Sequence, residues 1–359
     1  MDIKPHGGDI YEEIISGKPA PLDFSASISP LGLPDGVKSE LAARISEYES
    51  YPDPYCRELT AALTEKHGIP PERIHCGAGS ADLIFRVTRA LKPDRVLVTA
   101  PAFSEYERAA RESGAEVLRC PLSYPDFAVT EKTTEYAGQA DLVFLCNPNN
   151  PTGVLTPPDT IKQLLRACEA AGAVLVIDEC FMDLTDEPAA FTAEPLLTEH
   201  ENLIILKAFT KTWAMAGLRL GYALFGSAET AEGVAKTGPP WSVSAPAQIA
   251  GIQALKENEY YKKLRALIKE ERIQLKIGLI AVGAEVLGGS ANYIFFRYHN
   301  QKTGINLAEA LAAKGILIRD CSNFAGLEDG TYFRIAVRLA EENERLINAI
   351  STIVKNNVD

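Results

Sequence analysis

Short apolar runs alternate with helical patterns between residues 95 and 206, and this alternation limits the fold more than any other feature of the sequence. The apolar runs lie at residues 95–99, 116–119, 142–145, 174–177 and 203–206. Helical periodicity occurs between them, at residues 105–112 and 159–171. Short β-prone runs that alternate with helices are typical of a mostly parallel sheet with helices on both faces. The sequence therefore predicts an α/β domain whose ligand binds at the carboxyl ends of the strands.

The regions on either side of this alternation have a different character. Upstream, we expect a short strand within 23–30 and helices at 34–47 and 57–67. After Pro239-Pro240, helices are expected at 245–256, 260–280, 306–314 and 341–355, and strands at 291–297, 316–318 and 332–337. This order predicts a second, smaller α+β domain. We expect an N-terminal arm (1–35) that packs with the small domain and the active site, a large domain (36–250) and a small C-terminal domain (251–359).

Composition narrows the classes of partner. A net charge of −12 argues against nucleic acid and anionic membranes, so an anionic substrate would need locally placed cations. No stretch approaches 18 uninterrupted apolar residues, and the first eight residues lack the apolar run of a secretory signal. Seven dispersed cysteines without a Cys-x-x-Cys pair are typical of reduced thiols, so we expect a cytoplasmic protein. Five histidines without metal-ligand spacing lead us to predict no metal site.

Distinctive side chains follow four of the predicted strands. Phe103 comes after the first strand, the segment 147–153 (Asn-Pro-Asn-Asn-Pro-Thr-Gly) after the third, Asp178 and Glu179 after the fourth, and Lys211 after the fifth. Each group alone would most simply belong to a surface turn. Because parallel strands end at one edge of a sheet, the groups together predict a single site there.

Two cations close to the last of these strands suggest the chemistry. A lysine that is partly desolvated and near another cation has a lowered pKa and can attack carbonyls, which fits Lys211. The guanidinium of Arg219 could hold a phosphate, as could the backbone of the glycine-rich turn at 77–80. Lysine and arginine after a strand are about as often solvated loop residues, and glycine turns before helices are common, so neither feature is specific alone.

Taken together, the motifs resemble the fold-type I pyridoxal-phosphate enzymes of the aminotransferase superfamily. The shared motifs are the segment 147–153, then Asp-Glu-x-Phe from Asp178, then Thr-Lys at 210–211 followed by Arg-Leu-Gly-Tyr from Arg219. The resemblance extends from His6 to Arg334, nearly the whole chain. It implies a large domain with a mostly parallel sheet between helices and a smaller α+β domain, with pyridoxal 5'-phosphate as the cofactor.

The resemblance also implies a role for each matching residue. Lys211 would hold the cofactor aldehyde through its amine and later move protons, and Asp178 would pair with the pyridinium nitrogen. Asn150 would donate to the phenolic oxygen, and Phe103 would stack on the ring. The expected phosphate contacts are Gly79, Ser80, Ala81, Arg219 and Tyr51. The last of these resembles a tyrosine that reaches the site from a neighbouring subunit, which implies a homodimer.

Two positions depart from the pattern of many relatives. Ala208 occupies the position three residues before Lys211, where many relatives have a hydroxyl residue. One hydrogen bond to the cofactor phosphate is therefore expected to be absent. Thr210 carries a hydroxyl nearby and is a candidate cofactor contact. Phe181 replaces a tyrosine whose phenol would contact the cofactor oxygen. The second change disfavours simple transamination.

Two branches of the superfamily compete. One is histidinol-phosphate aminotransferase, which would use 2-oxoglutarate or glutamate. The other is the threonine-phosphate decarboxylase of cobalamin biosynthesis, which forms a phosphorylated amino alcohol, (R)-1-amino-2-propanol phosphate. The segments 6–8, 23–26 and 318–324, together with Phe181, resemble the decarboxylase. Its usual Asn-x-Asn-Pro is here Ser-Ile-Ser-Pro at 27–30, and L-serine O-phosphate is an alternative substrate because one methyl discriminates by only about 1–3 kcal/mol.

A decarboxylase must turn the substrate carboxylate out of the cofactor plane and hold the substrate by other groups. The residues implied for this task are His6, Gly7, Ser29, Asn150, Arg319 and Arg334. Arg338 is a further candidate, although a solvated charge is as plausible there. Transcription regulators use the same fold to bind the cofactor without turnover, but they add a basic DNA-binding domain, which neither the length nor the charge of this chain accommodates.

Overall fold

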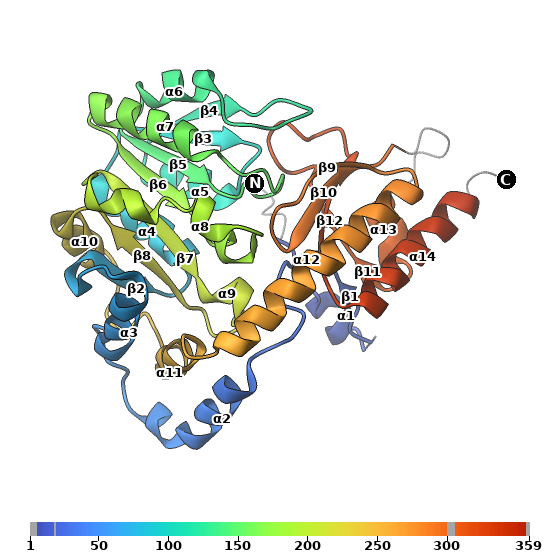
Figure 1. Ribbon diagram of the computed structural model, residues 1–359, viewed down its shortest axis with the longest axis horizontal. Coiled ribbons are helices and arrows are strands. Elements are labelled where there is room, and N and C mark those ends of the chain that lie inside the picture. The colour runs from blue at the N-terminus through green and yellow to red at the C-terminus, as the bar shows by residue number, and fades with distance from the viewer. Residues whose placement is uncertain (1–5, 18, 300–305, 357–359) are drawn as a thin grey trace.

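The computed structural model describes residues 6–17, 19–299 and 306–356, which form two large sheets flanked by helices and one small two-stranded sheet (Figure 1). The larger sheet has seven strands in the order β2-β8-β7-β6-β5-β3-β4. Their bounds are β2 Ile74–Gly77, β3 Arg95–Ala100, β4 Glu116–Pro121, β5 Leu142–Cys146, β6 Val174–Asp178, β7 Leu203–Ala208 and β8 Gly221–Phe225. The strands run parallel except β8, which is antiparallel to both of its neighbours. The predicted α/β fold is confirmed.

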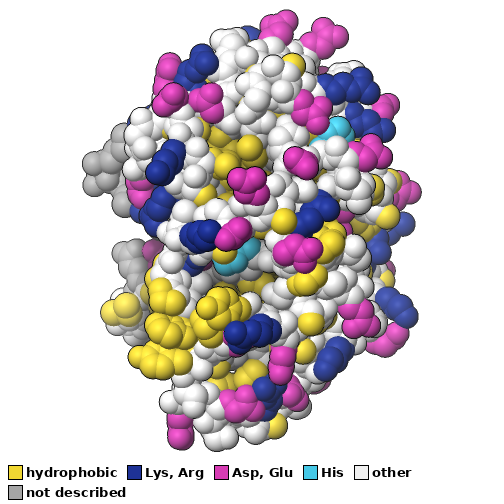
Figure 2. Space-filling view, turned by 90° about the vertical axis from the view of Figure 1, so that its left-hand side faces the viewer, with side chains coloured by type: hydrophobic (Ala, Val, Ile, Leu, Met, Phe, Trp, Pro, Cys, Tyr) yellow, Lys and Arg dark blue, Asp and Glu magenta, His cyan; other side chains and the backbone are white. Residues whose placement is uncertain are grey.

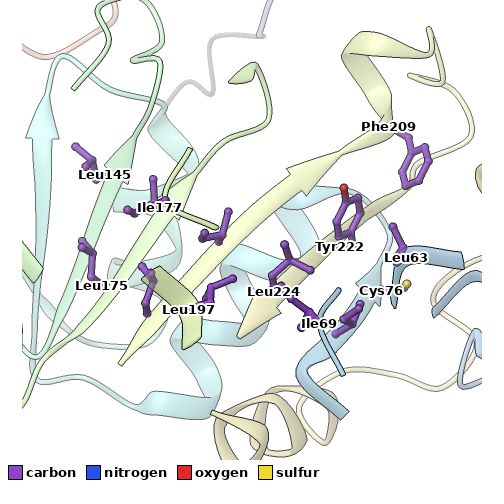
Figure 3. Close-up of a cluster of buried hydrophobic side chains, with 14 of the residues drawn as sticks. Leu63, Ile69, Cys76, Leu145, Leu175, Ile177, Leu197, Phe209, Tyr222 and Leu224 are labelled. Carbon is purple, nitrogen blue, oxygen red and sulfur yellow. The ribbon is translucent and has the colours of Figure 1, made fainter. Parts of the chain in front are cut away.

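Alternate residues of the central strands face opposite layers of helices. Leu175 and Ile177 of β6 belong to one apolar cluster, whereas Val176 belongs to the cluster on the other face. The first cluster packs under α3 (Arg57–His67), α7 (Pro158–Ala171) and α11 (Ala245–Ala254), and Figure 3 shows part of it. The second packs under α4 (Ser80–Leu91), α5 (Ser104–Glu112) and α10 (Ala228–Ala235). Burial on both faces explains why these strands are continuous apolar runs in the sequence.

The smaller sheet is antiparallel, in the order β12-β13-β10-β9. Its strands are β9 Glu285–Gly288, β10 Tyr293–Arg297, β12 Arg319–Asp320 and β13 Tyr332–Ala336. Helices α12 (Asn258–Ala281) and α14 (Ala340–Asn356) contribute to the apolar cluster on this sheet, and lie alongside it in Figure 1. A separate strand pair joins β1 (Leu22–Asp23) to β11 (Ile316–Leu317), so the N-terminal segment contacts the C-terminal part of the chain. The expected domain boundaries stay a prediction.

The remaining elements are short. They are the helices α1 (Tyr11–Ile15), α2 (Asp35–Ala43), α6 (Glu131–Ala137), α8 (Pro188–Phe191), α9 (Phe209–Thr212) and α13 (Leu307–Ala312), and the 3-10 turns at Ile45–Glu49, Pro71–Arg73, Met182–Leu184 and Glu194–Thr198. Within the described residues, no helix is long and apolar enough to cross a membrane. On the face drawn in Figure 2, acidic and basic side chains are interspersed.

Several sequence expectations were incomplete. The expected helix at 34–47 is divided, because α2 ends at Ala43 and a 3-10 turn follows. The strand expected within 23–30 is reduced to Leu22–Asp23. The strands β2, β8 and β9 and the helices α6, α8 and α10 were not expected. Strand β8 begins at Gly221, inside the Arg-Leu-Gly-Tyr motif, and has five residues. Its apolar run is too short to indicate a strand, and its antiparallel pairing depends on long-range contacts.

Candidate active site

The side chains that follow the parallel strands meet at one edge of the large sheet. Lys211 lies in α9, which begins directly after β7, and Asp178 is the last residue of β6. Asn150 is in the loop after β5, and Phe103 lies between β3 and α5. Strands β7, β6, β5 and β3 are consecutive neighbours in the sheet, so their carboxyl ends are adjacent. The single site expected at this edge is therefore geometrically possible, although the roles of its residues stay predictions.

The surroundings of Lys211 favour its neutral amine, which is the nucleophilic form. Part of its side chain is accessible, but loss of hydration and the nearby charge of Arg334 lower the pKa of Lys211 from 10.5 to about 8. The Phe181 ring lies 5.3 Å from its Nζ, measured to the ring centroid. A lysine with this pKa has a substantial neutral fraction near neutral pH, which attack on an aldehyde requires.

Both oxygens of the buried Asp178 carboxylate accept hydrogen bonds. The Tyr106 phenol donates to Oδ2 at 2.7 Å, and the backbone N–H of Cys180 donates to Oδ1 at 3.0 Å. Burial raises the pKa of Tyr106, and its ring stacks on Phe144 with centroids 5.0 Å apart, so the phenol stays protonated and fixed as a donor. The two hydrogen bonds fix the orientation of the Asp178 carboxyl group, which could pair with a pyridinium N–H.

A cradle for an anion lies at the start of α4. Gly79 has a φ of 92°, and a Cβ at this residue would lie 2.6 Å from Nη2 of Arg219. A Cβ on Gly221 would lie 2.6 Å from the backbone nitrogen of Ser80. The two glycines therefore let the Arg219 guanidinium and a neighbouring strand approach the N-terminus of a twelve-residue helix. The helix N–H groups of Ser80 and Ala81 together with the guanidinium fit a phosphate.

Arg334 connects the two sheets at this site. It lies in β13, donates through Nη1 to Oδ1 of Asn150, and donates through Nη2 to the Ser25 carbonyl at 2.9 Å. Its Nε is buried without a partner among the described residues, and its guanidinium lies 5.5 Å from the centroid of the Tyr293 ring. The Asn150 oxygen is therefore occupied, which leaves the amide NH₂ of Asn150 as the group that could donate to a ligand.

Arg319 is directly opposite Arg334 in the pairing of β12 with β13. Burial, with a contribution from Arg334, lowers the pKa of Arg319. Its guanidinium donates to Oδ1 of Asn323 at 2.6 Å and lies 5.1 Å from the centroid of the Phe324 ring. Like charges on directly opposite residues are unfavourable, so this pair is suited to an anion.

His6 comes from the N-terminal segment to the edge of the same region. Its Nε2 lies 2.9 Å from Oε1 of Glu105, and its ring centroid lies 5.4 Å from that of Phe103. His6, Phe103, Glu105 and Arg319 line a cavity of about 570 Å³. Lys211, Asp178 and Asn150 do not line this cavity, which lies on the Phe103 side of the site.

Three other predicted residues lie in less direct positions. The Ser29 N–H donates to the Lys211 carbonyl at 2.9 Å, but its hydroxyl is 2.6 Å from the Tyr260 hydroxyl. Thr210 is half-buried next to Lys211. Tyr51 is 83 % exposed and packs on Trp241 with ring centroids 4.9 Å apart, and no described contact joins it to the residues above.

Sequence reasoning missed several residues that support the site. Tyr106, Tyr293 and Glu105 were read only as helix or strand positions, and Ser25 only as part of a resemblance. Tyr293 donates to the Asn149 carbonyl at 2.7 Å and packs edge-on against Phe181. A signal existed for Tyr106, because it lies one helical turn after Phe103 and would share its face. No local signal exists for contacts between distant segments.

The residues present fit pyridoxal phosphate. A lysine with a lowered pKa, an aspartate, an amide donor and an aromatic ring follow adjacent parallel strands. The anion cradle follows β2 in the same sheet, and glycines keep it open. When bound, the cofactor would withdraw electrons from the α-carbon of an amino-acid substrate. Across the described residues, no cluster of three His, Cys, Asp or Glu side chains could hold a metal ion.

Comparisons with known proteins agree with this chemistry. The profile of the family "Aminotransferase class I and II" matches residues 21–350. A threonine-phosphate decarboxylase of Salmonella typhimurium is 35% identical over 97% of this chain and 96% of its own length. A histidinol-phosphate aminotransferase of Anaeromyxobacter sp. is 33% identical over 91% of this chain and 87% of its own length. The crystal structure of the histidinol-phosphate aminotransferase from Clostridium acetobutylicum superimposes with a TM-score of 0.87 at 28% identity, covering 93% of this chain and 99% of that chain. The chain therefore belongs to the class I and II aminotransferase family.

Proposed function

We propose that this protein is a pyridoxal-phosphate-dependent decarboxylase of L-threonine O-3-phosphate, with (R)-1-amino-2-propanol phosphate as the product, for cobalamin biosynthesis. The observation that carries the proposal is the pairing of Arg319 with Arg334 beside His6. A substrate with both a phosphate and a carboxylate would neutralise the two arginines, and His6 could hydrogen-bond to it. The similarity to the Salmonella decarboxylase over nearly the whole chain supports the same reaction.

The geometry supports a proposed set of cofactor contacts. Lys211 would hold the aldehyde, Asp178 would keep the ring nitrogen protonated, and Asn150 would donate to the phenolic oxygen. Phe103 would stack on the ring. The phosphate would lie in the cradle formed by Gly79, Ser80, Ala81 and Arg219. Ala208 carries no hydroxyl, so Thr210, which is adjacent to Lys211, is the proposed hydroxyl contact of the cofactor.

The residues that hold the substrate would determine which group leaves its α-carbon. Arg334 is fixed by Asn150 and the Ser25 carbonyl, so it would hold an anionic group of the substrate in one orientation. With Arg319 and His6 on the phosphate and Arg334 on the carboxylate, these residues would set the orientation in which the carboxylate leaves as carbon dioxide. Lys211 would then deliver a proton to the α-carbon, which balances the loss. Phe181 brings no phenol to compete for this proton.

Transamination remains the alternative function, and one observation favours it. Solved histidinol-phosphate aminotransferases share the fold closely, and relatives with that name cover most of this chain. In that reaction the carboxylate would be retained and the α-hydrogen removed, with 2-oxoglutarate or glutamate as the partner substrate. L-Serine O-phosphate is the alternative substrate for decarboxylation.

We also propose a cytoplasmic homodimer with shared sites. The exposed Tyr51 and its neighbour Trp241 form an aromatic surface pair that a second copy could cover. All seven cysteines are buried free thiols, which suits a reducing compartment. Light scattering would test the assembly, and a monomer at micromolar concentration would contradict it. Tyr51→Phe should then weaken cofactor binding only if the dimer forms.

Product analysis of the cofactor-loaded protein tests the reaction itself. L-Threonine O-3-phosphate, L-serine O-phosphate, and histidinol phosphate with 2-oxoglutarate would be supplied separately. Release of carbon dioxide from a phosphorylated amino acid without any keto acid is the expected result, and the relative rates would rank the two substrates. Glutamate formation without carbon dioxide would establish the aminotransferase instead.

A further inference from the structure

Glu105 joins the N-terminal segment to the edge of the active site. It lies in the first turn of α5 and is only 8 % exposed. Its Oε1 contacts Nε2 of His6 at 2.9 Å, across 99 positions of sequence. The hydrogen bond from His6, with further contributions from Arg108, lowers the pKa of Glu105 despite its burial. A carboxylate that is nearly buried at a cavity wall requires such partners.

The backbone next to His6 is fixed by separate contacts. A Cβ on Gly7 would lie 2.2 Å from the Ser25 carbonyl oxygen, so only glycine fits there. The Gly8 N–H donates to Oγ of Ser25 at 2.8 Å. The same Ser25 carbonyl accepts from Arg334. Ser25 therefore sets the position of the segment, whereas Glu105 sets the direction of the His6 ring.

The orientation of the ring matters because of what surrounds it. The His6 ring is tilted 42° to the Phe103 ring, which the proposed cofactor would stack on. The contact with Glu105 uses Nε2, so Nδ1 lies on the opposite side of the imidazole. Both His6 and Arg319 line the cavity of about 570 Å³.

We propose that Glu105 is a positioning residue that holds His6 so that its Nδ1 is presented to the phosphorylated end of the substrate. The inference rests on the proposed function, because it assumes a phosphorylated substrate in this cavity. In this proposal Glu105 acts on the substrate only through His6, and this dependence makes the proposal testable.

A purely structural role for Glu105 would look different. An acidic residue in the first turn of a helix is stabilised by the helix dipole, and Glu105 also lies 3.4 Å from Arg108. Loss of either interaction would lower stability whether or not His6 is present. The two explanations therefore differ in how the effects of two substitutions combine.

A double-mutant cycle with Glu105→Gln and His6→Ala tests the proposal. The readout is the Kd of L-threonine O-3-phosphate, taken from the change in cofactor absorbance, together with kcat/KM for carbon dioxide release. Glu105→Gln alone should raise this Kd and lower kcat/KM, each by about tenfold. This is the effect of losing one charge-assisted hydrogen bond of about 1.4 kcal/mol. In the His6→Ala background the same change should have no further effect. Equal losses in both backgrounds would overturn the proposal.

Two controls separate this result from other causes. Glu232→Gln, on α10, removes an exposed 2.6 Å contact with Lys236 outside this cavity and should leave substrate binding unchanged. The cofactor absorbance and cofactor Kd of every variant should match the parent, and a loss of cofactor from Glu105→Gln would refute a role limited to His6. If the parent protein transfers amino groups instead of releasing carbon dioxide, the proposed function fails. The cycle on histidinol phosphate binding then decides the His6–Glu105 coupling separately.

Discussion

The hydroxyl of Tyr106 donates a 2.7 Å hydrogen bond to Oδ2 of Asp178, and both side chains are buried. Tyr106 belongs to α5 and Asp178 to the end of β6, so the contact fixes the carboxylate against a helix on one face of the sheet. The carboxylate is the expected partner of the cofactor ring nitrogen. Its orientation therefore depends on a residue that does not itself reach the cofactor.

Tyr106→Phe should weaken pyridoxal-phosphate binding by about tenfold. The substitution keeps the stack on Phe144 but removes the hydrogen bond to Asp178. A hydrogen bond contributes about 0.5–1.5 kcal/mol, and the upper end of this range corresponds to about tenfold. The measurement is a titration of the apoprotein with cofactor, followed by absorbance. Tyr48→Phe removes a 2.7 Å bond to the Leu41 carbonyl and should leave cofactor affinity unchanged. Equal affinities of Tyr106→Phe and the parent would mean that Asp178 is held by other contacts.

Cofactor loading of the apoprotein should depend on pH through Lys211. Its pKa is lowered to about 8, and only the neutral amine attacks an aldehyde. The initial rate of loading should therefore rise with pH up to about 8 and level off above it, which stopped-flow absorbance would follow. Lys211→Ala should not produce the absorbance of lysine-bound cofactor at any pH. A rate that still rises tenfold per unit above pH 9 would show that the amine keeps its usual pKa.

The positive charge of Arg334 should lower the pH midpoint of cofactor loading, which reflects the pKa of Lys211. Arg334 is the charged residue with the largest lowering effect on Lys211, so Arg334→Met should move the midpoint of loading to higher pH. Arg338→Met removes a comparable arginine, bonded to Glu342 and the Asp23 carbonyl, and should leave the midpoint in place. An unchanged midpoint in Arg334→Met would assign the lowered pKa to desolvation and the charge of Arg219.

The sequence contained enough information to predict the large sheet and the position of the site. The central strands are apolar on both faces, so they stand out as continuous runs, and the residues after them necessarily share an edge. It did not reveal β8, because a short antiparallel strand that begins with Gly221 depends on its neighbours for pairing. The family resemblance supplied roles for residues such as Arg334 that no local pattern could.

Contacts between distant segments were beyond any local pattern. The bond from Arg334 to Asn150 spans 184 positions, and the contact of His6 with Glu105 spans 99. Periodicity reports on neighbours three or four positions apart in a helix and two apart in a strand, and these pairs lie in different elements. Ser29 illustrates the converse, because its motif position suggested the substrate, whereas its hydroxyl contacts Tyr260.

Gly7→Ala should reduce kcat/KM for the phosphorylated substrate without changing cofactor absorbance. The added Cβ would lie 2.2 Å from the Ser25 carbonyl, so the segment carrying His6 must move away from Phe103. The expected loss is similar to that of His6→Ala, and steady-state kinetics would measure it. Gly233→Ala adds a Cβ with no atom within 4 Å and should be neutral. Full activity in Gly7→Ala would indicate that His6 does not act on the substrate.

Lys207 should be essential for stability although it lies outside the proposed chemistry. It is 3 % exposed, and its Nζ lies 2.9 Å from Glu179 and 2.7 Å from Glu194. Lys207→Met would leave buried carboxylate charge without its partner, which typically costs about 3–5 kcal/mol. Urea unfolding of the apoprotein would measure the loss, and Lys207→Arg, which keeps the charge, should lose less. Lys236→Met breaks an exposed pair with Glu232 at 2.6 Å and should barely change the unfolding midpoint, because solvent screens that pair. If Lys207→Met unfolds at the same urea concentration as Lys236→Met, the buried carboxylates must be neutral in the folded protein.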